Sequence, residues 1–274
     1  MRGRVYRGGM TSLADLLSGS DRVLAFTGAG ISTESGIPDF RSPGGVWTRY
    51  DPQEFTFGRY TESARVRERS WRMRRELLAE APRPNAGHRA LARLEQSGRG
   101  LGVVTQNIDG LHQAAGSRRV VEVHGTALEV MCIGHAPTHG TPAGCGFRAP
   151  TAWAFEQVDA GDPDPLCPLC GGLVKSATVS FEQVLFPGVV EEALGLAGTC
   201  DLMLVVGSSL VVHPAAELPA VAVRNGTRLA IVNAEPTPYD ELADVGVRGG
   251  AGEVLSAAVG RVLGESGEQG HSSV

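Results

Sequence analysis

The chain lacks an apolar run long enough to span a membrane. A spanning helix needs about 18 or more consecutive apolar residues, and the sequence of 274 residues contains no such run. Residues 1–9 carry arginines but lack the apolar core of a secretion signal. We therefore expect a soluble, cytoplasmic protein that makes no contact with a membrane.

The chain also has little lysine and carries no net positive charge. Only one of the 25 basic residues is a lysine, Lys175, and the formal net charge is −5. A negative chain is a poor general binder of nucleic acid, because phosphate backbones attract cations. Residues 59–75 are locally basic, which fits either a solvated helix face with glutamate partners or a surface for anions. We expect no direct nucleic-acid partner.

Cysteines are few, and four of the five lie between 132 and 170. Cys167 and Cys170 form a Cys-x-x-Cys pair followed by two glycines, a spacing that lets both thiolates reach one tetrahedral zinc ion. Twelve residues lie between Cys132 and Cys145, which predicts a loop inserted into the other half of a four-thiolate site. The fifth, Cys200, is interpreted as a small buried apolar residue.

Two alternatives to the four-thiolate site remain open. His135 and His139 lie inside the inserted loop, and either imidazole could replace a cysteine as a zinc ligand. The four cysteines could instead form disulfides, although the interior of a cell disfavours them.

Short apolar runs that look like buried strands alternate with helical patterns. The strand-like runs are 22–27, 101–105, 119–123, 201–206 and 228–232. Helices are expected at 85–97 with Asn85 as N-cap, at 189–198, 214–224 and 253–263, and after an N-cap at Thr11 or Ser12. The alternation predicts an α/β fold with a doubly wound parallel, Rossmann-like sheet.

A glycine-rich turn, Gly28-Ala29-Gly30, follows the first of these strands. Such a turn lets a phosphate approach bare backbone N–H groups. The usual dinucleotide fingerprint has a third glycine where this chain has Thr33, which argues against an ordinary hydride-transfer enzyme. The loop continues through Pro38 to Asp39, Phe40 and Arg41, which would place a carboxylate, an aromatic ring and a guanidinium over a bound ligand.

Further motifs follow in a fixed order. Gln106-Asn107-Ile108-Asp109-Gly110-Leu111-His112 ends the strand at 101–105, and Val123-His124-Gly125 ends the next. With GAGIS and PDFR before them and the Cys-x-x-Cys pair after them, the sequence closely resembles the sirtuin family of NAD-dependent protein deacylases. The resemblance runs from about Asp21 to Leu263.

The resemblance implies two lobes with a substrate cleft between them. Residues 10–47, 85–128 and 175–263 would form the NAD-binding lobe. Residues 48–84 would form a helical module of the small lobe, and 129–174 its zinc-binding module. The ends, 1–9 and 264–274, are expected to be disordered and to contribute nothing to the fold.

The resemblance also assigns the strand ends to NAD, which sirtuins consume as a co-substrate. The glycine turn would meet the pyrophosphate, the 106–109 segment the nicotinamide pocket, and the later strand ends the rest of the dinucleotide. The expected contacts are Gly28, Ala29, Gly30, Ser32, Asp39, Phe40, Arg41, Gln106, Asn107, Ile108, Asp109, Gly207, Ser208, Ser209, Asn233, Glu235 and Ala251.

The resemblance names His124 as the catalytic base. Sirtuin chemistry requires a group that deprotonates a ribose hydroxyl, and an imidazole has a suitable pKa near neutrality. Asn107 and Asp109 would orient the cofactor in the same site. One structural zinc ion would be held by Cys132, Cys145, Cys167 and Cys170.

The substrate would be an acylated lysine on a protein. Val179, Phe181 and Val212 are expected to line its cleft, with Val179-Ser180-Phe181 pairing with an extended peptide. Sirtuins usually have glycine where this chain has Glu182, so the cleft departs from the family here. Trp71 and Arg74 match only half of the tyrosine–arginine pair that serves anionic acyl groups, and we expect a preference for neutral ones.

Rival functions use the same pocket. A protein mono-ADP-ribosyltransferase would transfer ADP-ribose from NAD, and a non-catalytic sensor would only bind NAD or ADP-ribose. The presence of His124, Asn107 and Asp109 favours an enzyme over a sensor. A hydride-transfer dehydrogenase is a weaker alternative.

Overall fold

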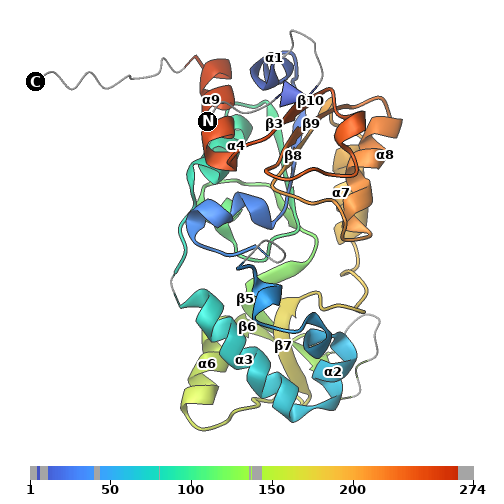
Figure 1. Ribbon diagram of the computed structural model, residues 1–274. Coiled ribbons are helices and arrows are strands. Elements are labelled where there is room, and N and C mark those ends of the chain that lie inside the picture. Colours follow the sequence, from blue (N-terminus) through green and yellow to red (C-terminus); the bar gives the residue numbers. More distant parts are fainter. Residues whose placement is uncertain are drawn as a thin grey trace, which may run out of the picture.

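The computed structural model describes residues 5–6, 12–39, 44–79, 81–135, 137 and 144–264. These residues form a large α/β lobe and a smaller lobe beside it, shown above and below each other in Figure 1. The chain leaves the large lobe twice to build the small one. No helix in these ranges combines the length and the apolar character needed to cross a membrane.

The large lobe is built on a seven-stranded sheet. Its order is β1 (Val5–Tyr6), β10 (Val245–Val247), β9 (Arg228–Val232), β8 (Leu202–Val206), β2 (Val23–Thr27), β3 (Gly100–Thr105) and β4 (Val120–Glu122). All neighbours are parallel except β1 and β10. The chain runs outward from β2 in one direction and from β8 in the other, so the switch point of the topology lies between these two strands.

Helices cover both faces of this sheet. One face carries α1 (Leu13–Ser18), α4 (Ala86–Gln96) and α9 (Ala251–Val262), and the other carries α7 (Val189–Ala197) and α8 (Leu218–Arg224) (Figure 1). Side chains alternate between the two layers: Ala25 packs with the first set of helices, and Phe26 with the second. The predicted fold class and the five predicted strands, observed as β2, β3, β4, β8 and β9, are confirmed, as are the N-caps Ser12 and Asn85.

The small lobe contains a three-stranded antiparallel sheet. Strand β5 (Gly125–Gly134) lies between β6 (Arg148–Pro150) and β7 (Leu173–Thr178). Helices α2 (Phe57–Glu62), α3 (Ala64–Leu78) and α6 (Thr151–Asp159) pack around it. Arg67 on α3 joins the two modules, because its guanidinium lies 2.7 Å from the Asp164 carboxylate and also donates to the Tyr60 carbonyl.

Short elements complete the described chain. Helix α5 (Leu111–Ala114) follows β3. The 3₁₀ turns are η1 (Ala29–Ile31), η2 (Thr33–Ser35), η3 (Val46–Thr48), η4 (Pro52–Phe55), η5 (Ala215–Glu217) and η6 (Asp240–Leu242).

Several expectations need correction. Val5–Tyr6, in the segment expected to contribute nothing to the fold, pair with β10 at the sheet edge. The helix expected at 214–224 begins as η5 and continues as α8. Strand β5 contains residue 128 and β7 contains residue 174, where the expected lobe division places its boundaries, and that division stays a prediction. Residues 265–274 lie outside the described ranges.

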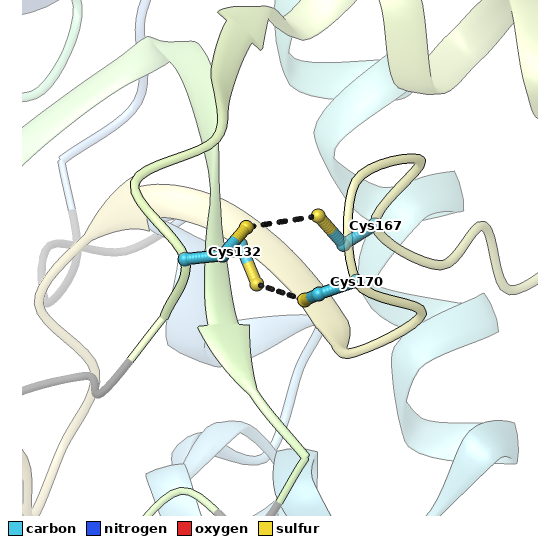
Figure 2. A group of neighbouring side chains, drawn as sticks. Cys132, Cys167 and Cys170 are labelled. Carbon is cyan, nitrogen blue, oxygen red and sulfur yellow. Dashed lines mark hydrogen bonds between the residues drawn. The ribbon is translucent and has the colours of Figure 1, made fainter.

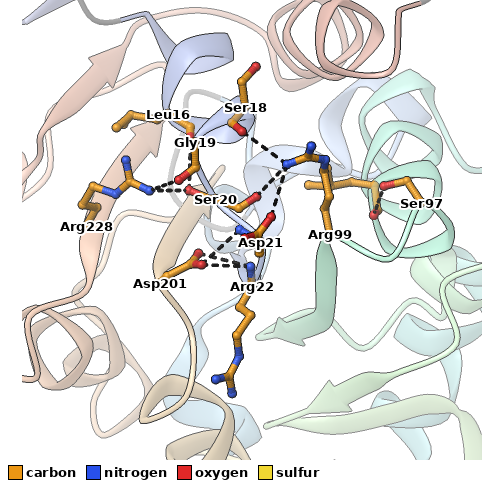
Figure 3. Close-up of polar contacts among 11 residues, drawn as sticks. Leu16, Ser18, Gly19, Ser20, Asp21, Arg22, Ser97, Arg99, Asp201 and Arg228 are labelled. Carbon is orange, nitrogen blue, oxygen red and sulfur yellow. Dashed lines mark hydrogen bonds and ion pairs between the residues drawn. The ribbon is translucent and has the colours of Figure 1, made fainter.

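Polar contacts tie the chain together at the amino-terminal end of the strands (Figure 3). The Asp201 carboxylate accepts hydrogen bonds from the backbone N–H groups of Asp21 and Arg22, at 3.0 and 3.1 Å. Arg228 donates to the Gly19 carbonyl at 2.6 Å. These contacts fix the turn between α1 and β2, so structural polar groups occupy this end and the opposite end is left for a site.

Candidate active site

A cavity of about 1060 Å³ lies at the carboxyl ends of β2, β3, β8 and β9 and reaches the small lobe. Parallel strands bring their carboxyl ends to one edge, which is where such sheets bind ligands. The predicted residues that border it are Ala29, Gly30, Ser32, Asp39, Gln106, Asn107, Ile108, Asp109, His124, Val179, Phe181, Gly207, Ser208, Ser209, Val212, Asn233, Glu235 and Ala251.

Three predicted residues remain: Gly28, Phe40 and Arg41. Phe40 and Arg41 lie outside the described residues. Gly28 lies behind the wall, where it supports the loop after β8: a Cβ added to it would come within 2.8 Å of the Gly207 carbonyl oxygen.

The glycines allow two loops to touch. The Gly30 N–H donates to the Gly207 carbonyl at 2.8 Å, and a Cβ on Gly30 would lie 2.8 Å from the Gly207 Cα. Gly207 itself has φ +62°, in the left-handed region that glycine adopts freely. The glycine loop, defined as residues 28–36, therefore lies against the end of β8 with backbone exposed to the cavity.

Ser32 is the centre of a polar network on the cavity wall. Its hydroxyl donates to Asp109 Oδ2 at 2.7 Å and accepts from Asn107 Nδ2 at 3.1 Å. Asn107 also donates to the Gly28 carbonyl at 3.2 Å. The network fixes the side chains of the 106–109 segment against the glycine loop.

Two buried histidines continue this network into the protein. His88 Nε2 lies 3.4 Å from the Ser32 hydroxyl, and the ring of His88 packs against that of His112 with centroids 4.8 Å apart. His112 Nε2 lies 2.9 Å from the Thr27 hydroxyl. Burial lowers the pKa of His88 to about 4, with Asp109 opposing the shift, and burial lowers that of His112 to about 3.

The histidine pair predicts a loss of stability in acid. Both folded-state pKa values lie below the unfolded value of 6.5, so the unfolded chain binds more protons as pH falls from 6.5 towards 4. The free energy of unfolding should fall by up to about 1.4 kcal/mol per pH unit for each histidine. Urea unfolding at pH 7 and pH 5 should show a smaller loss for His112→Gln than for the unmodified protein. Equal losses would contradict this assignment.

His124 borders the cavity with one nitrogen already engaged. Its Nδ1 lies 3.0 Å from the Gln106 carbonyl oxygen, so Nδ1 carries the proton of the neutral ring and Nε2 keeps its lone pair. Burial lowers the pKa of His124, and the bond to Gln106 opposes the shift. A neutral ring that can accept a proton is therefore its form near pH 7.

The small lobe supplies part of the wall that the sequence did not assign. Arg74 on α3 borders the cavity and donates through Nη2 to the Thr178 hydroxyl at 3.0 Å. Trp71, one turn earlier, is buried in the small-lobe core and does not border the cavity. Spacing along α3 alone could not reveal which side chain reaches the cavity.

Glu182 occupies an unusual backbone conformation. Its φ is +67°, in the left-handed region where a residue with a Cβ is strained by about 1–2 kcal/mol. Its side chain is exposed, and it borders the mouth of the cavity. The position has the backbone geometry of a glycine although its residue is glutamate.

The four cysteines meet in the small lobe, where Figure 2 labels Cys132, Cys167 and Cys170, and none of the four borders the cavity. The sulfur atoms of Cys132, Cys145, Cys167 and Cys170 all lie within 4.8 Å of one another. Tetrahedral zinc with Zn–S bonds of about 2.3 Å requires a cluster of this size. All cysteines are free, and Cys200 is buried in the large-lobe core as expected. His139 lies outside the described residues, and His135 is not part of the cluster.

The comparisons with known sequences all indicate the same family. The model of the Sir2 family matches residues 28–214. The NAD-dependent protein deacetylase 2 of Streptomyces coelicolor is 47% identical over 246 residues, which cover 88% of this chain and 98% of the relative. The NAD-dependent protein deacylase 2 of Pyrobaculum aerophilum is 42% identical over 256 residues, covering 92% and 95%.

Solved structures agree with the sequence matches. A Sir2 complex with a p53 peptide and NAD⁺ has a TM-score of 0.81 and 36% identity, covering 94% of this chain and all of the other. A Sir2 variant with a deacetylated p53 peptide and 3′-O-acetyl-ADP-ribose has a TM-score of 0.81 and 37% identity, covering 92% and 98%. From the family match, the identities and the shared fold, this chain belongs to the Sir2 family, the sirtuins.

Proposed function

We propose that this protein is an NAD-dependent protein lysine deacylase. The observation that carries the proposal is the position of His124, whose ring borders the cavity between the glycine loop and the segment that starts at Val179. A backbone hydrogen bond joins His124 to that segment, because the Val179 N–H donates to the His124 carbonyl at 2.8 Å. Curated relatives that are 47% and 42% identical are named as a deacetylase and a deacylase of this kind.

The cavity suits a dinucleotide substrate. Its volume of about 1060 Å³ is at the upper end of small-molecule sites. Bare backbone at Gly30 and Gly207 allows close approach of a pyrophosphate, and Asn233 and Glu235 border the cavity at the end of β9. NAD would supply the bond between nicotinamide and ribose that the reaction breaks.

His124 acts as the general base in this proposal. The Gln106 carbonyl holds the proton on Nδ1, so Nε2 is the atom that accepts a proton from a ribose hydroxyl. The lowered pKa keeps the ring neutral until the pH falls below its ordinary value. The deprotonated ribose oxygen can then attack the acyl carbon.

Ser32, Asn107 and Asp109 orient the reacting end of NAD. Their mutual hydrogen bonds hold the Asn107 amide and the Asp109 carboxylate in one arrangement before substrate arrives. Asp109 also accepts from the Leu111 N–H at 2.9 Å, which fixes its second oxygen. These groups position substrate and move no proton.

The reaction balances with one water molecule. Nicotinamide leaves with the electron pair of its bond to ribose, and the acyl oxygen of the modified lysine bonds to the anomeric carbon. The acyl carbon then bonds to a ribose hydroxyl oxygen, its bond to the lysine nitrogen breaks and the amine is released. Water adds to the acyl carbon, and the bond from that carbon to the anomeric oxygen breaks, which leaves a hydroxyl on the anomeric carbon. NAD, acyl-lysine and water therefore give nicotinamide, free lysine and O-acyl-ADP-ribose.

The remaining parts have supporting roles in the proposal. The four-cysteine cluster would hold one structural Zn²⁺ in the small lobe, remote from the chemistry. The lobe division expected from the sequence stays a prediction. We also propose a cytoplasmic location, supported by cysteines that are all free.

One incubation separates this function from its rivals. The protein is mixed with NAD and a library of acyl-lysine peptides, and nicotinamide and peptide mass are followed together. A deacylase releases nicotinamide only with peptide, and the peptide loses its acyl group. A peptide that gains ADP-ribose would indicate a mono-ADP-ribosyltransferase, and binding of NAD without nicotinamide release would indicate a sensor.

The segment 179–181, which is expected to pair with the substrate peptide, leads to a prediction at Glu182. The Phe57 N–H donates to the Phe181 carbonyl at 3.0 Å, which fixes the backbone of the 179–181 segment against the helical module. Glu182→Gly should relieve the strain of φ +67° and stabilise the protein by about 1 kcal/mol. It should also raise kcat/KM on acyl peptides, because the peptide can approach more closely.

Glu182→Ala is the matched control for that variant. It removes the carboxylate but keeps the Cβ, so it should not gain the stability seen with glycine. Urea unfolding and steady-state assays compare the two. Equal stability of the glycine and alanine variants would show that backbone strain at 182 is absent.

The position of Arg74 argues against the neutral acyl preference expected from the sequence. Its guanidinium borders the cavity, and among the described residues no carboxylate forms an ion pair with it. Burial lowers the pKa of Arg74, so an incoming carboxylate would offset the cost of burying the charge. Glu182, in contrast, is exposed and its charge is screened by water. We propose that acyl groups ending in a carboxylate are substrates.

Acyl preference can be measured directly. Succinyl-lysine peptides should be turned over with a kcat/KM about tenfold or more above acetyl-lysine peptides, as for one charge-assisted hydrogen bond. Arg74→Met should abolish this advantage while acetyl-lysine activity remains. Faster turnover of acetyl-lysine by the unmodified protein would restore the neutral preference.

A further inference from the structure

The glycine loop is held between the N-termini of two helices that are far apart in sequence. On one side is α4, which begins after Asn85, and on the other is α9, which begins after Gly250. Neither side involves His124, whose Nδ1 bonds to the Gln106 carbonyl, although Asn85 also hydrogen-bonds to His88, which lies beside the Ser32 hydroxyl. The glycine loop and residues 249–251 both border the cavity, and the contacts described below join these two parts of its wall.

Asn85 uses both ends of its amide. Its Oδ1 accepts from the N–H groups of Gly87 and His88, at 2.9 and 3.3 Å, and so caps α4. Its Nδ2 donates to the Ile31 carbonyl at 2.7 Å and to the Ser35 hydroxyl at 2.9 Å. One buried side chain therefore starts the helix and fixes two points of the glycine loop.

Glu34 makes the contact on the other side. Its Oε1 accepts from the Gly252 N–H at 2.9 Å, in the first turn of the 12-residue α9. The N-cap of α9 is Gly250, which has no side chain to accept this bond, so Glu34 caps the helix from 218 residues away. A carboxylate at this end is also favoured by the helix dipole.

Glycines make this arrangement possible. A Cβ added to Gly252 would lie 2.2 Å from Glu34 Oε2, and one added to Gly250 would lie 2.9 Å from Oε1. A Cβ on Gly87 would lie 3.4 Å from the backbone nitrogen of Gly252, so α4 and α9 also meet closely. Loop, α4 and α9 thus form one packed junction beside the cavity.

We infer that Asn85 and Glu34 are positioning residues that set the affinity for NAD. They hold the glycine loop, which includes Ala29, Gly30 and Ser32, against the start of α9, where Ala251 borders the same cavity. A loop released from either contact must be ordered again when NAD binds, which weakens binding without changing the reacting groups. The inference rests on the proposed use of NAD.

Asn85→Asp separates the two roles of that amide. Aspartate still caps α4, since it is as good an N-cap as asparagine, but it places an oxygen against the Ile31 carbonyl. Glu34→Ala removes the acceptor for Gly252, and Glu34→Gln restores it. Asn225→Asp is the control for the charge change, because Asn225 is exposed at the end of α8, far from the loop in sequence.

The test is calorimetric binding of NAD and steady-state kinetics on the full chain with its zinc. Asn85→Asp and Glu34→Ala should each raise the Kd and KM for NAD about tenfold. Their kcat should stay within about threefold of the unmodified value, and the KM for acyl peptide should not change. Glu34→Gln and Asn225→Asp should bind NAD normally.

Other outcomes overturn the inference in distinguishable ways. Normal NAD affinity in both variants, or a fall in kcat at unchanged KM, would show that the junction does not set NAD binding. If Asn85→Asp fails to fold, Glu34→Ala and its rescue by glutamine decide the matter alone. An unmodified protein that binds no NAD would overturn the proposed function together with the inference.

Discussion

Replacing His124 by alanine is expected to lower kcat for deacylation by about 10²- to 10⁴-fold, the usual contribution of a general base. The affinity for NAD should stay within about threefold, because the His124 ring takes part in neither the glycine contacts nor the Ser32 network. Steady-state assays on an acyl-lysine peptide measure the first quantity, and calorimetry with NAD measures the second.

The contrast between the two measurements defines the role of His124. A general base acts on the transition state, so its removal lowers turnover and leaves ground-state binding intact. The pH profile gives a second readout: the acid limb of kcat/KM should lie below pH 6.5 because burial lowers the pKa of His124. Parallel losses of NAD binding and turnover in His124→Ala would show that the residue is structural.

Cys145→Ser is expected to remove the zinc ion from the small lobe. Structural zinc sites contribute about 10–16 kcal/mol of binding free energy in small domains, and this variant deletes one of the four sulfur ligands of the cluster. We expect one zinc per chain in the unmodified protein and much less in the variant, with unfolding of the small lobe at a lower temperature. Metal analysis and thermal unfolding measure the two effects.

Cys200→Ser is the matched control for the zinc site. Cys200 lies in the large-lobe core, where it packs with residues of α7 and β8. Its replacement should leave one zinc per chain. Full zinc occupancy and unchanged stability in Cys145→Ser would instead assign the fourth ligand position to His135 or His139.

The sequence predicts the two strands at the centre of the large sheet well because they are buried on both faces. Strands β2 and β8 are apolar along most of their length and fully buried, a pattern that needs no knowledge of the fold. Strand β10 has only three residues with Gly246 at its centre, and β1 has two, so neither shows a pattern in the sequence. In β5 the alternation is interrupted, because the pairing with β7 shifts register after Gly125.

Some residues of the candidate site could likewise be predicted from the sequence, and others could not. Gln106, His124 and Gly207 could be found from the sequence because each follows a predicted strand, and the ends of parallel strands converge. The loop contacts of Asn85 and Glu34 could not, since they depend on how α4 and α9 approach the cavity, and Arg74 is singled out only through the family resemblance, as half of a pair. The Asn85 cap was visible locally, but its contact with Ile31 joins segments 54 residues apart.

The fate of the acyl group tests the proposed function most directly. A peptide with an acylated lysine is incubated with NAD, and nicotinamide, free-lysine peptide and the acyl-bearing product are quantified by mass spectrometry. The proposed mechanism predicts the three products in equal amounts, with the acyl group on ADP-ribose, and almost none of them from His124→Ala. Release of the acyl group as a free acid while NAD stays intact would contradict it.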